Sequence, residues 1–134
     1  MNNWISEETN LLPDFIIAGA MKCGTSTLHT ILNKHPKIFI PKEEVHFFDM
    51  DNILQHSDFN FHHNETWTTQ SMDKDPELVW KWYQKKFKGN ESLIKGEDST
   101  TYLASRCAAE RISMQKKEIN QLKNEIENIL NEDY

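Results

Sequence analysis

The sequence predicts an α/β fold, in which a parallel sheet with flanking helices is followed by a long C-terminal helix. Two short apolar runs, residues 15–18 and 38–40, enclose a glycine-containing loop and a segment with helical spacing. The order strand, loop, helix, strand is typical of βαβ-type units in parallel sheets. Residues 104–131 contain neither Gly nor Pro and are rich in Ala, Glu, Lys, Gln and Leu, which favours a helix.

The composition limits the classes of function. The chain has 134 residues, a hydrophobic fraction of 37% and a formal net charge of −6, which suits one small domain or part of a larger one. An acidic chain is a poor candidate for a nucleic-acid binder, so we expect no nucleic-acid partner. A local basic pocket for a small anion needs only a few residues and stays compatible with this charge.

The sequence shows no pattern for export or membrane insertion. Residues 1–10 lack the basic and apolar regions of a signal peptide, and the longest apolar run, residues 15–21, is too short to span a bilayer. Two cysteines, Cys23 and Cys107, cannot form a disulfide framework. We expect a cytoplasmic protein without a membrane partner.

The elements of the first third follow from local patterns. Residues 1–12 are polar and predict a flexible leader. Residues 15–18 are β-branched and aromatic, which favours a strand buried on both faces. Residues 25–27 supply capping hydroxyls for a helix that ends before Pro36.

The middle of the chain combines an irregular segment with a second helix. Residues 50–74 are polar and rich in His and Asn, which predicts a loop. Asp75 and Pro76 begin a helix as N-cap and first-turn residue. A short strand at residues 93–94 then leads into residues 95–100. The apolar stripe of the helix, predicted to be core, consists of Val79, Trp80, Tyr83 and Phe87.

The C-terminal segment, residues 104–131, carries a heptad pattern. As one helix it would be about 40 Å long at ~1.5 Å per residue. Apolar residues occupy the seam positions of a coiled coil, and Gln115 interrupts them. Such a stripe needs a partner, which is either the same helix of a second chain in a homodimer or the chain's own sheet. The stripe consists of Ile112, Ile119, Leu122, Ile126 and Ile129.

Residues 19–26, Gly-Ala-Met-Lys-Cys-Gly-Thr-Ser, form a P-loop-like phosphate-binding pattern. In the nucleotide-triphosphatase form a lysine follows the second glycine, whereas here Thr25 takes that place and Lys22 lies inside the loop. Backbone N–H groups at a helix N-terminus still bind an anion, aided by the helix dipole. Lys22 is placed to reach the bridging oxygen of a leaving group rather than a γ-phosphate, which disfavours a kinase-like domain.

Three motifs in order give the chain a family resemblance. Residues 15–28 contain Lys-Cys-Gly-Thr at 22–25, residues 42–49 read Lys-Glu-Glu-Val-His-Phe-Phe-Asp, and residues 95–103 read Lys-Gly-Glu-Asp-Ser-Thr-Thr-Tyr-Leu. Together they resemble the heparan-sulfate and bacterial branches of the sulfotransferases that use 3′-phosphoadenosine 5′-phosphosulfate (PAPS). The resemblance covers residues 13–111. It implies transfer of a sulfuryl group from PAPS to a hydroxyl or amine, without a metal.

The resemblance also implies a role for each matching residue. Lys22 would neutralise the charge that develops on the bridging oxygen of the leaving group. Glu44 would be the general base, and His46 would assist it or orient the acceptor. The 5′-phosphate would be held by Cys23, Gly24, Thr25, Ser26 and Thr27. The acceptor, a small molecule or a carbohydrate, would be contacted by Lys42, Glu97 and Ser99.

Several of these roles have a competing interpretation. Glu44 stands next to Glu43 and is also explained as a surface carboxylate. His46 is also explained as a core residue, because two phenylalanines follow it. The six histidines lack the usual spacing of metal ligands, so we expect no metal site.

The sequence departs from the family after residue 111. The arginine and serine that bind the 3′-phosphate in the family have no counterpart there. The sulfotransferase domain is therefore predicted to be incomplete, with residues 13–103 as its N-terminal part and residues 104–131 as an added helix. Two functions follow: the chain is a sulfotransferase fragment, or it is a catalytically silent binding or assembly module that self-associates through its C-terminal helix.

Overall fold

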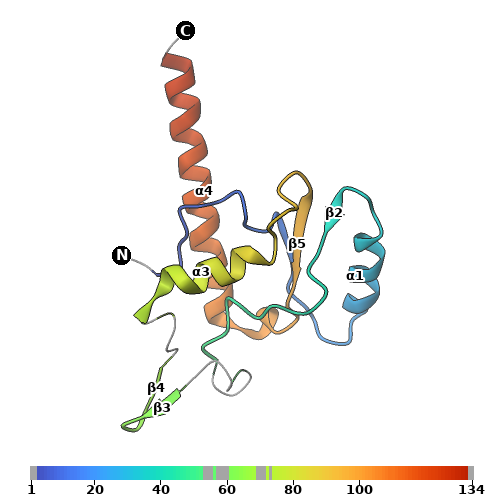
Figure 1. The fold of residues 1–134 in the computed structure, drawn as a ribbon, viewed down its shortest axis with the longest axis vertical. Helices are drawn as coiled ribbons and strands as arrows, with labels where there is room; N and C mark the ends of the chain where they lie inside the picture. The colour runs from blue at the N-terminus through green and yellow to red at the C-terminus, as the bar shows by residue number, and fades with distance from the viewer. Residues whose placement is uncertain (1–2, 53–55, 57–60, 69–71, 73, 133–134) are drawn as a thin grey trace.

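The computed structural model describes residues 3–52, 56, 61–68, 72 and 74–132 (Figure 1). A strand–helix–strand unit opens the chain, and one long helix ends the described part. The elements are β1 (Phe15–Ile17), α1 (Thr25–Asn33), β2 (Ile38–Phe39), β3 (Phe61–His63), β4 (Thr66–Thr68), α3 (Pro76–Lys85), β5 (Ile94–Asp98), the 3₁₀ turn η2 (Tyr102–Ala104) and α4 (Arg106–Glu132).

In the described part of the chain, β1, β5 and β2 form a three-stranded parallel sheet, which confirms the predicted α/β class. β5 lies in the middle, with Gly96 opposite Phe15 and Ile94 opposite Ile38. Figure 1 shows α1 beside β2, at one flank of the sheet. Because parallel strands end at the same edge, the glycine loop after β1 meets the residues that follow Asp98.

The core is built from aromatic rings of α3 and of the segment after β2. Phe47 stacks on Tyr83 with ring centroids 4.1 Å apart, and both side chains are fully buried. Trp80 packs against Phe47 at 4.7 Å. Full burial of one such side chain contributes about 1.5–3 kcal/mol. The start of α3 is also as predicted, since the Asp75 side chain accepts a hydrogen bond from the Leu78 N–H at 3.1 Å.

A β-hairpin lies within the region that the sequence predicted to be irregular. β3 and β4 pair antiparallel, with Phe61 opposite Thr68. The turn residues Asn64 and Glu65 both have positive φ, 48° and 60°. Two-residue turns of this kind favour Asn and Gly. With a glutamate at the second position, the sequence lacks the Asn-Gly pattern that would have indicated a hairpin. The prediction of a loop was wrong for residues 61–68.

Residues 3–12, part of the segment predicted to be a flexible leader, lie against α3 and α4. The Ser6 N–H donates to Gln115 Oε1 at 2.6 Å, and the Ser6 carbonyl accepts from Gln115 Nε2 at 3.1 Å. The Arg111 guanidinium stacks on the Trp4 ring at 3.8 Å. Ser6 and Gln115 are 109 positions apart, so no local pattern could reveal this contact.

α4, predicted over residues 104–131, projects away from the sheet at its C-terminal end (Figure 1). Its first half packs on the core through Ile112 and Ile119. Further along, the exposed fractions of Ile126 and Ile129 are 56% and 59%. The chain's own fold therefore covers part of the predicted stripe, and the coiled coil stays a prediction. None of the described helices combines the length and apolarity needed to cross a bilayer.

Candidate functional site

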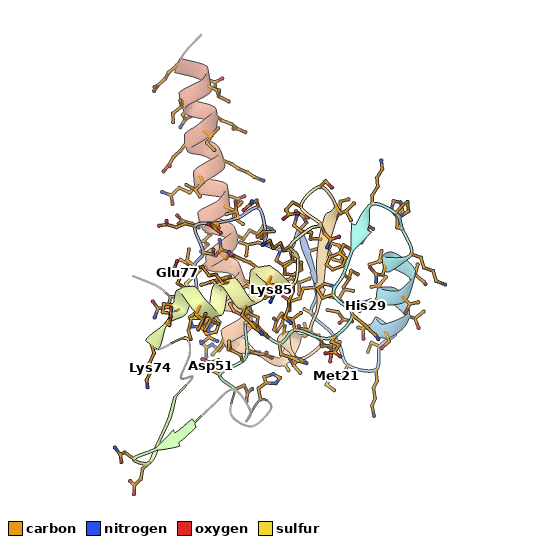
Figure 2. The ribbon with its side chains drawn as sticks, viewed as in Figure 1. Met21, His29, Asp51, Lys74, Glu77 and Lys85 are labelled. Carbon is orange, nitrogen blue, oxygen red and sulfur yellow. The ribbon has the colours of Figure 1, made fainter. Side chains whose placement is uncertain are left out.

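A cavity of about 620 Å³ opens at the edge of the sheet where β1 and β5 end. It lies between α1, the glycine loop, the segment after β2 and the residues at the end of β5. Met21 and His29, labelled in Figure 2, belong to its α1 side. The cavity is lined by Met21, Lys22, Thr25, Ser26, His29, Thr30, Asn33, Lys34, Lys42, Glu44, Asp98 and Thr100.

The glycine loop and the first turn of α1 form one wall. Gly24 is the N-cap of α1 with φ 80°, and Lys22 has φ 59°. No side chain caps this helix, so the hydroxyls of residues 25–27 do not take the capping role that the sequence predicted. The Cys23 N–H is used inside the loop, donating to the Ala20 carbonyl at 3.2 Å. An uncapped N-terminus leaves first-turn N–H groups and the positive end of the helix dipole for an anion.

Gly19 lets the loop pack closely against the segment after β5. Its φ is 143°, and a Cβ there would lie 2.9 Å from the Thr100 carbonyl oxygen and 3.0 Å from Leu103 Cβ. The Leu103 N–H donates to the Ala18 carbonyl at 2.9 Å, which holds the two segments together. The first glycine of the motif is therefore required to bring Thr100 beside the loop.

Glu44 lines the same cavity as Lys22. Glu44 Oε1 accepts two hydrogen bonds from Thr100, one from the backbone N–H at 2.9 Å and one from the hydroxyl at 2.6 Å. Glu44 Oε2 lies 3.4 Å from His46 Nε2. Burial acts to raise the pKa of Glu44, but the hydrogen bonds from Thr100 and the nearby His46 outweigh it and hold the pKa below its usual value. The Glu44 carboxylate is therefore ionised at neutral pH.

The backbone that follows Glu44 is bound by two side-chain hydroxyls. Ser99 Oγ accepts from the N–H groups of residues 45 and 46, at 3.2 and 2.9 Å. The Tyr102 hydroxyl accepts from the N–H groups of residues 47 and 48, at 2.8 and 3.1 Å. These two hydroxyls position the part of the cavity wall that carries Glu44.

The remaining predicted site residues separate into two groups. Lys42 lines the cavity, whereas His46, Glu97 and Ser99 are not among its lining residues. Of the predicted phosphate-binding residues, Thr25 and Ser26 line it, and Cys23, Gly24 and Thr27 do not. Glu97 and Ser99, predicted to contact the acceptor, are fully buried. Glu97 accepts hydrogen bonds from the hydroxyls of Tyr83 and Ser99, and its burial raises the pKa of its carboxyl group. The structure thus places Glu97 and Ser99 beneath the cavity wall, which they support.

The sequence interpretation did not single out the pair His29 and Asp98, which also lines the cavity. His29 Nδ1 lies 2.9 Å from Asp98 Oδ2. Asp98 Oδ1 is buried and has no hydrogen-bond partner among the described residues. Asp98 is the last residue of the buried strand β5. His29 stands four residues after Thr25, so these two residues lie on one face of α1. Neither sequence position identifies a site residue until the pairing of β1 with β5 is known.

The cavity is locally basic although the chain is acidic overall. In its described lining, Lys22, Lys34 and Lys42 accompany two carboxylates, those of Glu44 and Asp98. A cleft that concentrates charge of one sign attracts small counter-ions whatever the net charge of the molecule. The geometry therefore suits a small anionic ligand at the α1 wall and a carboxylate opposite it.

A second cluster of polar side chains lies behind the Glu44 wall. One possible ligand atom from each of His46, Asp49 and His56 lies within 4.8 Å of the other two. Thr101 connects two of the residues, since its hydroxyl donates to Asp49 Oδ2 at 2.5 Å and lies 3.0 Å from His46 Nδ1. The sequence predicted no metal site, because the spacing of these residues follows no common ligand pattern.

Comparison with known proteins gives a family match over most of the chain. A family model described as the sulfotransferase family matches residues 13–128. The match contains every residue of the cavity lining and extends past residue 103, where the sequence predicted the domain to end, through most of α4. Neither a curated protein nor a solved structure matches the chain.

Proposed function

Because the chain belongs to the sulfotransferase family, we propose that it transfers a sulfuryl group from PAPS to a hydroxyl or amine of a small-molecule or carbohydrate acceptor. One observation carries the proposal. Lys22 and the uncapped N-terminus of α1 share a cavity with the ionised Glu44. The cavity thus combines an anion-binding wall with a proton acceptor.

In the proposed reaction, the α1 wall binds the donor. The first-turn N–H groups, with Thr25 and Ser26, hold the 5′-phosphate. Lys22 faces the oxygen that bridges phosphorus and sulfur in PAPS. It neutralises the negative charge on this oxygen as the oxygen–sulfur bond breaks. Adenosine 3′,5′-bisphosphate is the leaving group. Lys42, which lines the cavity beside Glu44, is placed to bind the acceptor.

Glu44 receives the proton in this reaction. The acceptor oxygen or nitrogen forms a bond to sulfur and loses its proton to Glu44. Thr100 occupies Oε1 through two hydrogen bonds, which leaves Oε2 as the oxygen that accepts the proton. The lowered pKa keeps Glu44 ionised and limits its strength as a base, so proton transfer accompanies formation of the new bond to sulfur.

A second candidate function, self-association through α4, rests on a separate observation. Ile126, Ile129 and Leu130 have exposed fractions of 55% to 59% near the end of this helix. An assembly role does not require the cavity, and it is compatible with sulfuryl transfer.

Titration with adenosine 3′,5′-bisphosphate in a calorimeter tests the donor site. The wild type should bind, and Lys22→Ala should weaken binding by about tenfold or more, since hydrogen bonds to charged groups are the stronger ones. Lys81→Ala is the matched control, because Lys81 is exposed on α3 and pairs with Glu77. A wild type that does not bind the bisphosphate, or an equal affinity of the Lys22→Ala variant, would overturn the proposed donor site.

A further inference from the structure

We propose that His46, Asp49 and His56 bind one divalent transition-metal ion of the Zn²⁺ type behind the cavity wall. Their ligand atoms lie within 4.8 Å of one another, and Asp49 Oδ1 is already 3.1 Å from His56 Nε2. Ligand atoms around one tetrahedral zinc ion lie roughly 3.3 Å apart. The imidazole rings of His46 and His56 lie side by side, with centroids 4.6 Å apart, and binding of one ion requires both rings to turn toward it.

The burial of Asp49 favours a positive charge at this place, which an ion shared with His56 would supply. Its side chain is fully buried, and its Oδ1 accepts no hydrogen bond from the described residues. Burying a carboxylate without a positive partner is strongly unfavourable. Arg111 is not the positive partner of Asp49, because its two terminal nitrogens bind Asp51 at 2.7 and 2.6 Å. Asp51 is labelled in Figure 2. The ion pair that the structure shows for Asp49 is with His56.

The donor set matches a metal of this type. Two imidazole nitrogens and one carboxylate oxygen suit Zn²⁺ and neighbouring transition metals, and three protein ligands leave a position for water. Thr101 supplies the outer support that metal ligands commonly have, since it contacts both Asp49 Oδ2 and His46 Nδ1. His46 is held at φ 52°, an uncommon conformation for a residue with a side chain.

The site is separate from the cavity and acts on it through one contact. None of the three proposed ligands lines the cavity. Because His46 Nδ1 faces Thr101, Nε2 is the nitrogen that would bind the ion. His46 Nε2 lies 3.4 Å from Glu44 Oε2, so an ion bound there also restricts Glu44. The inference is thus a structural metal site that holds a positioning residue, and it stands whether or not the chain transfers sulfuryl groups.

Cobalt and zinc binding test the site directly. The full chain, treated with a chelator and dialysed, should develop a visible d–d absorption band on addition of Co²⁺, and Zn²⁺ should abolish the band by displacement. Saturating Zn²⁺ should also raise the thermal midpoint by about 4 °C or more, because an ion that binds only the folded chain stabilises it. No band and no shift in the wild type would overturn the proposal.

Three variants locate the ion. Asp49→Asn and His56→Gln should each lose the band and the thermal shift, whereas the double variant His62→Gln, His63→Gln, which removes the adjacent histidines of the β3–β4 hairpin, should keep both. Loss of binding only in the hairpin variant would place the ion elsewhere and overturn the proposal. Asp49→Asn also changes a buried residue, so His56→Gln with an unchanged circular dichroism spectrum provides the deciding comparison.

Discussion

The Thr100 hydroxyl donates a 2.6 Å hydrogen bond to the Glu44 carboxylate, 56 positions away in the chain, and the Thr100 N–H donates to the same oxygen. Thr100 follows β5, whereas Glu44 follows β2, so the bond joins the segments that leave two neighbouring strands. It fixes one carboxylate oxygen of Glu44, and the other lies 3.4 Å from His46 Nε2. The first prediction concerns that carboxylate.

Glu44→Gln should lower kcat by about 10²–10⁴, the usual contribution of a general base. The affinity for adenosine 3′,5′-bisphosphate should stay unchanged, because the amide keeps the shape of the wall. Transfer of radiolabelled sulfate to a panel of alcohols and amines measures the first quantity and calorimetry the second. Glu43→Gln is the control, because it removes a neighbouring carboxylate and should leave kcat unchanged if Glu44 is the general base. Equal activity of the two variants would remove the catalytic role.

The buried Glu97 should make the wild type lose stability as pH rises. Burial is the largest effect on this group and raises its pKa above 4.5 despite hydrogen bonds from Ser99, Tyr102 and Tyr83. The folded chain then keeps a proton that the unfolded chain has released. The free energy of unfolding should therefore fall as pH rises from 4.5 through the folded-state pKa.

Glu97→Gln should abolish this part of the pH dependence, because a glutamine has no proton to release. Urea unfolding of both proteins at several pH values above 4.5 measures the effect. The stability of the wild type relative to Glu97→Gln should decline along the series. Parallel curves would show that burial does not control this carboxyl group.

Gln115→Ala should lower the free energy of unfolding by about 1–3 kcal/mol, since it leaves the buried Ser6 N–H and carbonyl without their partners. Gln121→Ala, at an exposed position of the same helix, should change stability by less than about 0.5 kcal/mol. Urea unfolding monitored by tryptophan fluorescence compares the two. Similar small effects would mean that the N-terminal segment contributes little to the fold.

The exposed end of α4 should mediate a homodimer. Burying Ile126 and Ile129 against a second helix contributes about 1.5–3 kcal/mol for each side chain. Sedimentation should therefore show a dimer for the wild type and a monomer for Ile126→Lys with Ile129→Lys. Asn124→Lys with Asn131→Lys adds the same charge on the opposite face of the helix and should leave the dimer intact. A monomeric wild type at high concentration would contradict the prediction.

Elements with a strong local pattern were predictable from the sequence. The β1–α1–β2 unit and the buried stripe of α3 depend on residues close in the chain, and the structure confirms them. The joint position of Lys22 and Glu44 on one cavity followed from the motif resemblance. The roles assigned to these residues are what the activity measurements above would test.

Features that depend on distant contacts were not predictable. Gln115 looked like a defect in the heptad seam, whereas it binds the backbone of Ser6 across the fold. Glu97 was assigned to the acceptor by the motif resemblance, whereas the structure buries its side chain completely. Asp98 and His29 come together only after β5 pairs with β1. In each case the deciding partner is far away in the sequence.

The backbone of residues 45–48, which belongs to the cavity wall that carries Glu44, is bound by the hydroxyls of Ser99 and Tyr102. The position of this wall therefore depends on two side chains and not on a strand ladder. A strand in a ladder is held by the backbone of its neighbours, whereas residues 45–48 are held by two side-chain hydroxyls, which a substitution can remove without removing a backbone hydrogen bond of the sheet. Ser99→Thr or Tyr102→Phe would thus change the shape of the cavity wall that carries Glu44, while the glycine loop stays in place. If the proposed reaction holds, such substitutions would change the choice of acceptor and leave the binding of adenosine 3′,5′-bisphosphate unchanged.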